Sequence, residues 1–239
     1  MRGGFGLKKS QTAKYAQDPE IGIRLSPQAR KEQILKAAID YFAEVGFSGQ
    51  TRELSRRIGV SQALVYRYFP SKADLIDEVF EAVFMRKWNP QWIRDLRHRK
   101  TPIRERLIHF YTQYANATYR PEWIRIYMFA GLAGMGWNRN YLDFVRRKLL
   151  TVICEEIRYE FSRSKTMKGQ AKISSREIEV IWNLHGSMFY WAVRCNIFGI
   201  DSSVPFEIRA ADAVDLFLAG AAKVYPQLVR ESSAAKPPR

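Results

Sequence analysis

TRELSRRIGVSQALVYRYFPSK, residues 51–72, contains two short helical segments on either side of a glycine and ends at a proline. Gly59 supplies a tight turn, Ser61 is a favoured N-cap for the second segment, and Pro70 stops that helix. Basic and aromatic side chains crowd the second segment. This arrangement is typical of a helix-turn-helix whose second helix enters the major groove of DNA.

The two sides of the second helix differ in chemistry. One side is expected to join a three-helix core made of Ile39, Phe42, Leu54, Ile58, Val60, Val65 and Phe69. The other side is left outward and carries Gln62, Ala63, Tyr66 and Arg67, with Leu64 on its flank. Each of these residues alone also fits simple packing or a solvated surface, but their combination favours DNA recognition.

The outward residue types suit specific contacts with a duplex. Gln62 can bond in a bidentate manner to adenine N6 and N7, Ala63 permits close approach, and Leu64 can meet a thymine methyl. Ser61 caps the helix, so the positive end of its dipole can meet a phosphate. Further phosphate contacts, which fix register without selecting sequence, are predicted for Thr51, Arg52, Tyr66, Arg67, Tyr68 and Lys72.

GVSQALVYRYFPSKADLI, preceded by ILKAAIDYFAEVGF, resembles the DNA-binding domain of the tetracycline-repressor (TetR-type) regulators. The resemblance covers about residues 28–80. It implies an all-helical homodimer that represses transcription at a palindromic double-stranded DNA operator until a small molecule binds. By the same resemblance, Gln62, Ala63 and Leu64 match base-contacting positions, and Thr51, Ser61, Tyr66, Tyr68 and Lys72 match phosphate-contacting positions.

One departure from that family concerns the start of the second helix. The chain is one residue shorter than the common pattern between Gly46 and Leu54. Gln50 therefore falls where a Ser or Thr usually caps this helix. The departure weakens the case for the Thr51 contact more than for any contact on the recognition helix.

Composition and charge agree with a DNA-binding globular protein. The chain has 239 residues, of which 46% are hydrophobic, and a formal net charge of +15, which favours a polyanionic partner. Residues 1–90 hold 15 Lys and Arg against 10 Asp and Glu, so most of the excess lies further along the chain. Cys154 and Cys195 are expected to be buried free thiols. Without a signal segment or an apolar run of membrane length, a cytoplasmic protein that does not enter membranes is expected.

Helices and no convincing strand are predicted between the two ends, so the expected fold class is all-α. Ser26-Pro27 opens the first helix and Gly46 ends it, and Ser71 with Asp74 opens the fourth. The later helices are expected at about 102–118, 121–133, 139–164, 175–198 and 206–225, with an exposed loop at 162–171. The domain plan is a flexible basic arm at 1–25, the helix-turn-helix domain at 26–74, a larger helical domain for ligand binding and dimerisation at 75–228, and a disordered tail at 229–239.

The last two long helices are the natural place for a dimer interface, with Ile178, Ile181, Trp182, Val214, Phe217 and Leu218 as candidates. The alternative is that these residues pack inside one subunit. A pocket for a largely apolar or aromatic effector is predicted among Phe110, Tyr114, Trp123, Tyr127, Met128, Phe144, His185 and Phe189. Here too the alternative is ordinary core packing.

Catalytic and metal-binding patterns are absent from the sequence, so no enzyme, cofactor or metal site is expected. His98, His109 and His185 do not have metal-ligand spacing, and there is no GxSxG motif. The leading hypothesis is a ligand-responsive regulator, expected to be a repressor. Two alternatives stay open: a DNA-binding protein of the same fold that acts through a protein partner, and a helical enzyme or carrier with a vestigial DNA-binding module.

Overall fold

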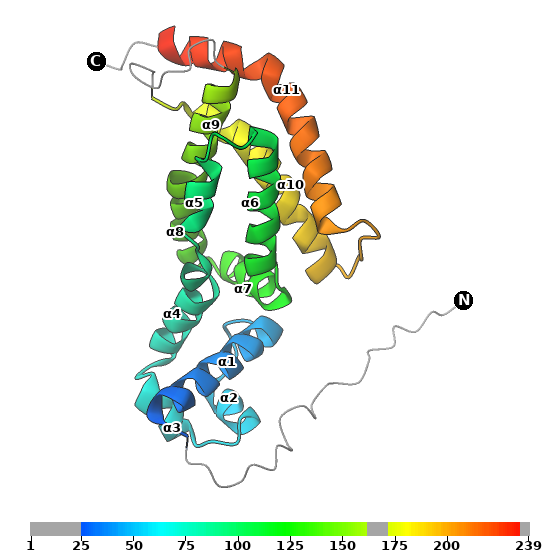
Figure 1. Ribbon diagram of the computed structural model, residues 1–239. Coiled ribbons are helices and arrows are strands. Elements are labelled where there is room, and N and C mark those ends of the chain that lie inside the picture. The colour runs from blue at the N-terminus through cyan, green and yellow to red at the C-terminus, as the bar shows by residue number, and fades with distance from the viewer. Residues whose placement is uncertain (1–24, 162–171, 235–239) are drawn as a thin grey trace. The chain divides into compact units, whose positions relative to one another are not determined.

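The computed structural model describes residues 25–161 and 172–234. Every regular element in these two ranges is a helix, as the sequence predicts. The chain divides into two compact units between Val79 and Phe80 (Figure 1). The loop expected at 162–171, the last residues of the expected tail and, apart from Leu25, the expected arm lie outside the described residues.

The first unit contains α1 (Pro27–Val45), α2 (Thr51–Arg57), α3 (Gln62–Tyr68) and the first part of α4 (Lys72–Val83). The predicted helix ends are confirmed for α1: the Ser26 hydroxyl accepts a hydrogen bond from the Ala29 amide at 3.2 Å, and Gly46 ends the helix with φ of 75°. At the start of α4, the Ser71 hydroxyl accepts from the Asp74 amide at 3.1 Å. These local signals fix where the helices of this unit begin and end.

The second unit is a helical bundle formed by the described residues from Phe80 onward. Its elements are a 3₁₀ turn (Met85–Lys87), α5 (Gln91–Leu96), α6 (Ile103–Thr118), α7 (Pro121–Leu132), α8 (Trp137–Val145), the π turn η2 (Arg146–Leu150), α9 (Thr151–Phe161), α10 (Ser175–Asn196) and α11 (Phe206–Ala234). Within this unit, α11 packs against α6, α9 and α10 (Figure 1). The core is rich in aromatic side chains.

Helix α5 was not expected from the sequence, and α4 ends earlier than the expected limit near Asn89-Pro90. The α5 segment is only six residues long and lies in a basic stretch, so it has no amphipathic repeat. Its two anchors are Trp92 and Leu96, which are four residues apart and both buried. Packing of this buried face in the core therefore stabilises the short helix, which local helix propensity alone would not stabilise.

The single helix expected at 139–164 is interrupted by the π turn. The described part runs from Trp137 to Phe161, and its middle turn, Arg146–Leu150, has π-helical hydrogen bonding. Leu149 and Leu150 are both fully buried. Because a π turn inserts one extra residue, it allows these two adjacent leucines to point into the core.

Helix α11 runs to Ala234, beyond the expected end at residue 225, so residues 229–234 are helical and not part of a disordered tail. Pro226 lies inside the helix, and this residue favoured an earlier end. Tyr225 and Leu228 on either side of it are buried. Packing of these two side chains holds the helix through the proline.

The start of α10 is tied to α9 by a buried ion pair. Ser174 and Glu177 form the predicted capping box. The Arg158 guanidinium donates to both carboxylate oxygens of Glu177, at 2.5 and 2.6 Å, and both side chains are almost completely buried. Burial alone would raise the pKa of Glu177, but the bonds from Arg158 and Ser174 outweigh it and lower this pKa. The carboxylate is therefore charged and fully hydrogen-bonded.

Candidate nucleic-acid interface

Helices α2 and α3 are joined by a turn that needs a glycine. Gly59 has φ of 68°, in the left-handed region that side chains with a Cβ rarely adopt. The Ser61 hydroxyl then accepts a hydrogen bond from the Leu64 amide at 3.2 Å and caps α3. By contrast, Gln50 makes no side-chain cap at the start of α2. The helix-turn-helix expected from residues 51–72 is therefore present.

The inner side of α3 packs on α1 and α2 through fully buried residues. Val65 and Phe69 on this side, like Leu54 of α2 and Phe42 of α1, are no more than 2% exposed. Ile39, Ile58 and Val60, also expected in this core, are only half-buried. Ile34, which was not expected there, is fully buried because the apolar stripe of α1 lies further round the helix.

The predicted DNA-contacting residues fall into three groups by exposure. Those that are exposed are Arg52, Ser61, Ala63, Tyr66 and Arg67. Those that are half-buried are Gln62, Leu64, Tyr68 and Lys72. Thr51 alone is buried, at 5% exposed. The outward side of α3 thus keeps a polar and basic surface that its own unit does not cover.

Thr51, Gln62 and Tyr66 bond to one another, and we call this group the Thr51–Gln62–Tyr66 triangle. The hydroxyls of Thr51 and Tyr66 are 2.8 Å apart. The Gln62 amide Nε2 donates to Thr51 Oγ1 at 3.0 Å and faces Tyr66 Oη at 3.5 Å. The triangle joins the first residue of α2 to two successive turns of α3.

The charged residues of α2 and α3 divide into paired and unpaired groups. Arg56 and Arg57 bind Glu53, and Arg57 also binds Glu44 at 2.6 Å. The hydrogen bonds from these two arginines lower the pKa of Glu53. Within the described residues, neither Arg52 nor Arg67 has an ion-pair partner. These two exposed guanidiniums are the free positive charges of the surface.

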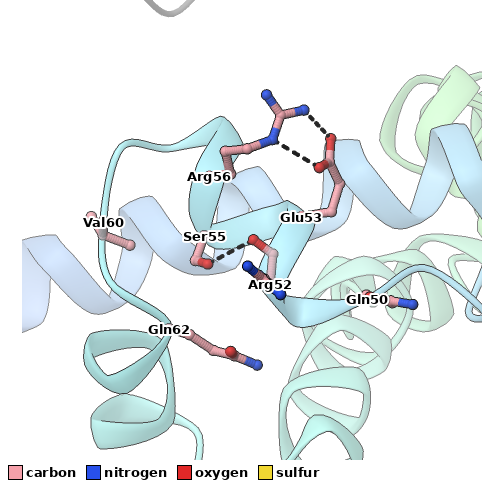
Figure 2. A pocket seen from close by; sticks show the side chains of 7 residues that line it. All are labelled: Gln50, Arg52, Glu53, Ser55, Arg56, Val60 and Gln62. Carbon is pink, nitrogen blue, oxygen red and sulfur yellow. Dashed lines mark hydrogen bonds and ion pairs between the residues drawn. The ribbon is translucent and has the colours of Figure 1, made fainter.

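An open hollow of about 540 Å³ lies between α2, the turn and the start of α3. Figure 2 shows the side chains that line it, with Gln62 from α3 and Arg52 from α2 on the same side. The Ser55 hydroxyl donates to the Arg52 carbonyl at 2.8 Å and is held away from solvent. The polar groups that remain at the rim are Gln50, Arg52 and Gln62.

Known proteins share both the sequence of this region and the fold of the chain. Residues 34–79 match the family described as bacterial regulatory proteins, tetR family. This segment of the chain, which contains the helix-turn-helix, is therefore similar to the DNA-binding domain of tetR-family regulators. The HTH-type transcriptional regulator LuxR of Vibrio harveyi is 41% identical over 61 residues, which make up 25% of this chain and 30% of that protein. The sequence likeness to this relative therefore spans under a third of its length.

Solved structures extend the likeness to most of the fold. A tetR-family transcriptional regulator from Streptomyces coelicolor superposes with a TM-score of 0.59 and 19% identity, covering 89% of this chain and 92% of that one. A transcriptional regulator of Pseudomonas aeruginosa PAO1 gives a TM-score of 0.59 and 18% identity, with 87% and 96% covered. The chain, including its second unit, thus has a fold in common with regulators whose sequences differ widely from it.

The residues predicted for an effector pocket form part of an aromatic cluster in the second unit. Phe110, Tyr114, Trp123 and His185 are buried, and Tyr127, Met128, Phe144 and Phe189 are half-buried. Tyr127 stacks on Trp123 with ring centroids 5.3 Å apart and meets Phe189 at 5.2 Å. Phe144 packs at 4.9 Å on Trp88, which the prediction did not include.

Several polar atoms in this cluster are buried without a partner among the described residues. They are Tyr111 Oη, Tyr119 Oη, Trp123 Nε1 and His185 Nδ1. Tyr114 and Tyr141 differ, because their hydroxyls are 2.7 Å apart. Burial lowers the pKa of His185 to about 4, so its ring is neutral near pH 7. Tyr111, Tyr119 and Tyr141 were missed from the sequence because their apolar spacing is that of ordinary core.

The described residues offer no site for a metal and no membrane helix. They contain no group of three or more His, Cys, Asp or Glu side chains that could hold a metal ion. In the same ranges, no helix is both long and apolar enough to cross a membrane. Cys154 is buried and Cys195 half-buried, and both are free thiols.

Proposed function

We propose that this protein is a ligand-responsive transcriptional regulator that binds a palindromic DNA operator as a homodimer and represses transcription until an effector binds. The observation that carries the proposal is the uncovered outward side of α3, with Gln62, Ala63 and Arg67 beside a compact three-helix core. The TetR-family match over residues 34–79 supports it. Because that family consists of regulators, it also favours a protein without catalysis.

The chemistry of this surface fits the major groove. Gln62 can hydrogen-bond a base edge, and Ala63 leaves room for the helix to approach the bases. Arg67 and Arg52 have no competing carboxylate among the described residues, so both can bind phosphates. Lys72, at the start of α4, is half-buried and gives a further phosphate contact. The buried Thr51 is not proposed as a direct contact.

A second copy of the chain is the proposed partner at α10 and α11. Leu216 is 77% exposed and borders a shallow hollow of about 490 Å³ between these helices, with Leu184 and Phe217 among its lining residues. Trp182 and Leu218 are half-buried and can join this interface. Ile178, Ile181 and Val214 are buried inside the subunit, so they are left out of the proposed interface.

The effector is proposed to bind in the aromatic cluster of the second unit. Rings of Trp123, Tyr127 and Phe189 provide apolar contacts, and the unpartnered polar atoms of Tyr119 and His185 provide hydrogen bonds. A buried polar group without a partner costs free energy, which a bound molecule can recover. We therefore expect a largely aromatic or apolar molecule that carries one or more hydrogen-bonding groups.

The test begins with selection of bound duplexes from a random pool by the full-length chain, followed by fluorescence anisotropy titrations at several salt concentrations. Enrichment of a two-fold symmetric sequence supports the proposal, and so does weaker binding by Arg67→Ala. Lys100→Ala serves as the matched control, since it removes one exposed positive charge from the second unit. The proposal fails if no sequence is enriched or if both variants lower affinity equally.

A further inference from the structure

The Thr51–Gln62–Tyr66 triangle restricts how Gln62 can meet DNA. The Gln62 side-chain amide has two N–H donors and one acceptor oxygen. Its nitrogen lies 3.0 Å from Thr51 Oγ1 and 3.5 Å from Tyr66 Oη, and because these two oxygens are only 2.8 Å apart, they share one N–H. No hydrogen-bond partner is present for Gln62 Oε1 within the described residues. One N–H is therefore turned inward, and the oxygen and the second N–H are left free.

Thr51 holds the Gln62 side-chain amide in this orientation. Its side chain is only 5% exposed, and its hydroxyl is held between the Tyr66 hydroxyl at 2.8 Å and the Gln62 amide. Thr51 sits at the first residue of α2, whose position is fixed by the buried Leu54. A rigid neighbour that holds a contacting side chain in one rotamer reduces the entropy lost on binding.

A free amide oxygen distinguishes the bases by their major-groove edges. Adenine presents an N6 amino group and cytosine an N4 amino group, and either can donate to that oxygen. Guanine presents only the acceptors N7 and O6, and thymine presents the acceptor O4 and a methyl group. Because the second N–H of Gln62 is free, it can donate to adenine N7 while the oxygen accepts from N6, which is the bidentate adenine contact expected from the sequence.

We propose that Thr51 and Tyr66 are positioning residues that hold the Gln62 amide with its oxygen and its second N–H toward the groove, so that Gln62 selects an A·T base pair through adenine. This inference rests on the proposed DNA-binding function. It assigns the buried Thr51 a role in sequence preference without a DNA contact of its own.

The experiment is a selection from a random duplex pool with the full-length chain and four variants, followed by sequencing. The base position contacted by Gln62 is the one whose preference Gln62→Ala removes. At that position the native chain should enrich A·T over G·C pairs. Thr51→Val keeps the side-chain shape but removes the hydroxyl, and should reduce this enrichment by about tenfold while other positions keep their preferences.

Two further variants separate orientation from folding. Thr51→Ser retains the hydroxyl and should keep the native preference. Tyr66→Phe removes only an exposed hydroxyl, and should reduce the same preference by a smaller factor even if Thr51→Val fails to fold. Circular dichroism of each variant checks its helical content.

The outcomes that overturn the inference differ from those that overturn the proposed function. Enrichment of a G·C pair at the Gln62 position refutes the orientation. An unchanged preference in both Thr51→Val and Tyr66→Phe refutes the positioning role, and so does a Gln62→Ala variant that alters no position. In each case DNA binding itself stands. If the native chain enriches no duplex, the proposed function fails as well.

Discussion

Acid should destabilise the second unit through His185, and replacing this residue should remove that effect. His185 lies on α10 in the aromatic cluster, is 7% exposed, and packs on Tyr111 and Tyr114 with ring centroids 6.0 and 5.5 Å away. Burial lowers its pKa from 6.5 to about 4. The rings beside it belong to Tyr111, Tyr114 and Trp182, and none of these side chains carries a carboxylate.

The sign and size of the effect follow from this pKa difference. Between about pH 6.5 and about pH 4 the unfolded chain binds a proton on His185 and the folded chain does not, so acid favours unfolding. The contribution of the neutral His185 ring to the stability of the second unit is fully present above pH 6.5 and is lost as the pH falls towards 4. At about 1.4 kcal/mol for each pKa unit, moving from about pH 7.5 to about pH 5 should cost roughly 2 kcal/mol.

Urea unfolding followed by tryptophan fluorescence measures this directly, because all six tryptophans of the chain lie in the second unit. His185→Gln should be less stable than the native chain near pH 7.5 but should lose roughly 2 kcal/mol less on acidification. Met188→Leu, one turn along α10 and fully buried, changes packing without changing a titratable group and should keep the native pH dependence. Equal pH dependence in the native chain and His185→Gln would refute the reasoning.

Three other changes test separate parts of the account. Gln62→Ala should cost about 1–3 kcal/mol of base preference at one operator position. Lys72→Ala should weaken binding to all sequences alike and lower the slope of log affinity against log salt concentration by about one. Both are measured by anisotropy titration, and equal uniform losses would contradict the division between base and phosphate contacts. Leu54→Ala, at a fully buried site, should lower the stability of the first unit by about 2–5 kcal/mol in urea unfolding followed by circular dichroism, and a loss confined to the tryptophan signal would be inconsistent with its place in the core. Glu177→Gln removes the carboxylate that the buried Arg158 guanidinium binds and should cost the second unit about 3–5 kcal/mol in the fluorescence assay. An unchanged unfolding midpoint would contradict this expectation.

The fold of the first unit could be predicted because its signals are local. Ser26, Gly46, Gly59 and Ser61 each act within four residues of the backbone group they satisfy or the turn they permit. Such short-range chemistry is visible in a single sequence. The same holds for the capping box at Ser174.

The parts that could not be predicted depend on contacts between distant residues. The buried Glu156 carboxylate accepts from both Arg99 and Arg106, which are at least 50 positions away in the sequence, and charge patterning along one helix does not indicate this group. The π turn before Thr151 likewise exists because two adjacent leucines are buried by other helices. Helical periodicity predicts neither the buried Glu156 ion pairs nor the π turn.

The candidate DNA surface has one feature that could be predicted from the sequence and one that could not. Its outward residues could be predicted because the apolar residues of α3 fix which side faces the core. The inward hydrogen bonds of Gln62 could not be predicted, because they depend on a side-chain rotamer and on Thr51 eleven residues away. The sequence therefore indicates which residues face outward, and the structure adds which hydrogen-bonding atoms each of them has available.

The central claim is that two copies of the outward α3 surface occupy successive major grooves of one duplex. A major-groove protection footprint on the selected duplex, in which guanine N7 methylation is measured with and without the full-length chain, tests it directly. The account predicts two protected patches related by symmetry, with centres about 34–36 Å or a multiple of that apart along the duplex, and loss of both with Arg67→Ala. A single protected patch, or tight binding with no major-groove protection, would contradict it.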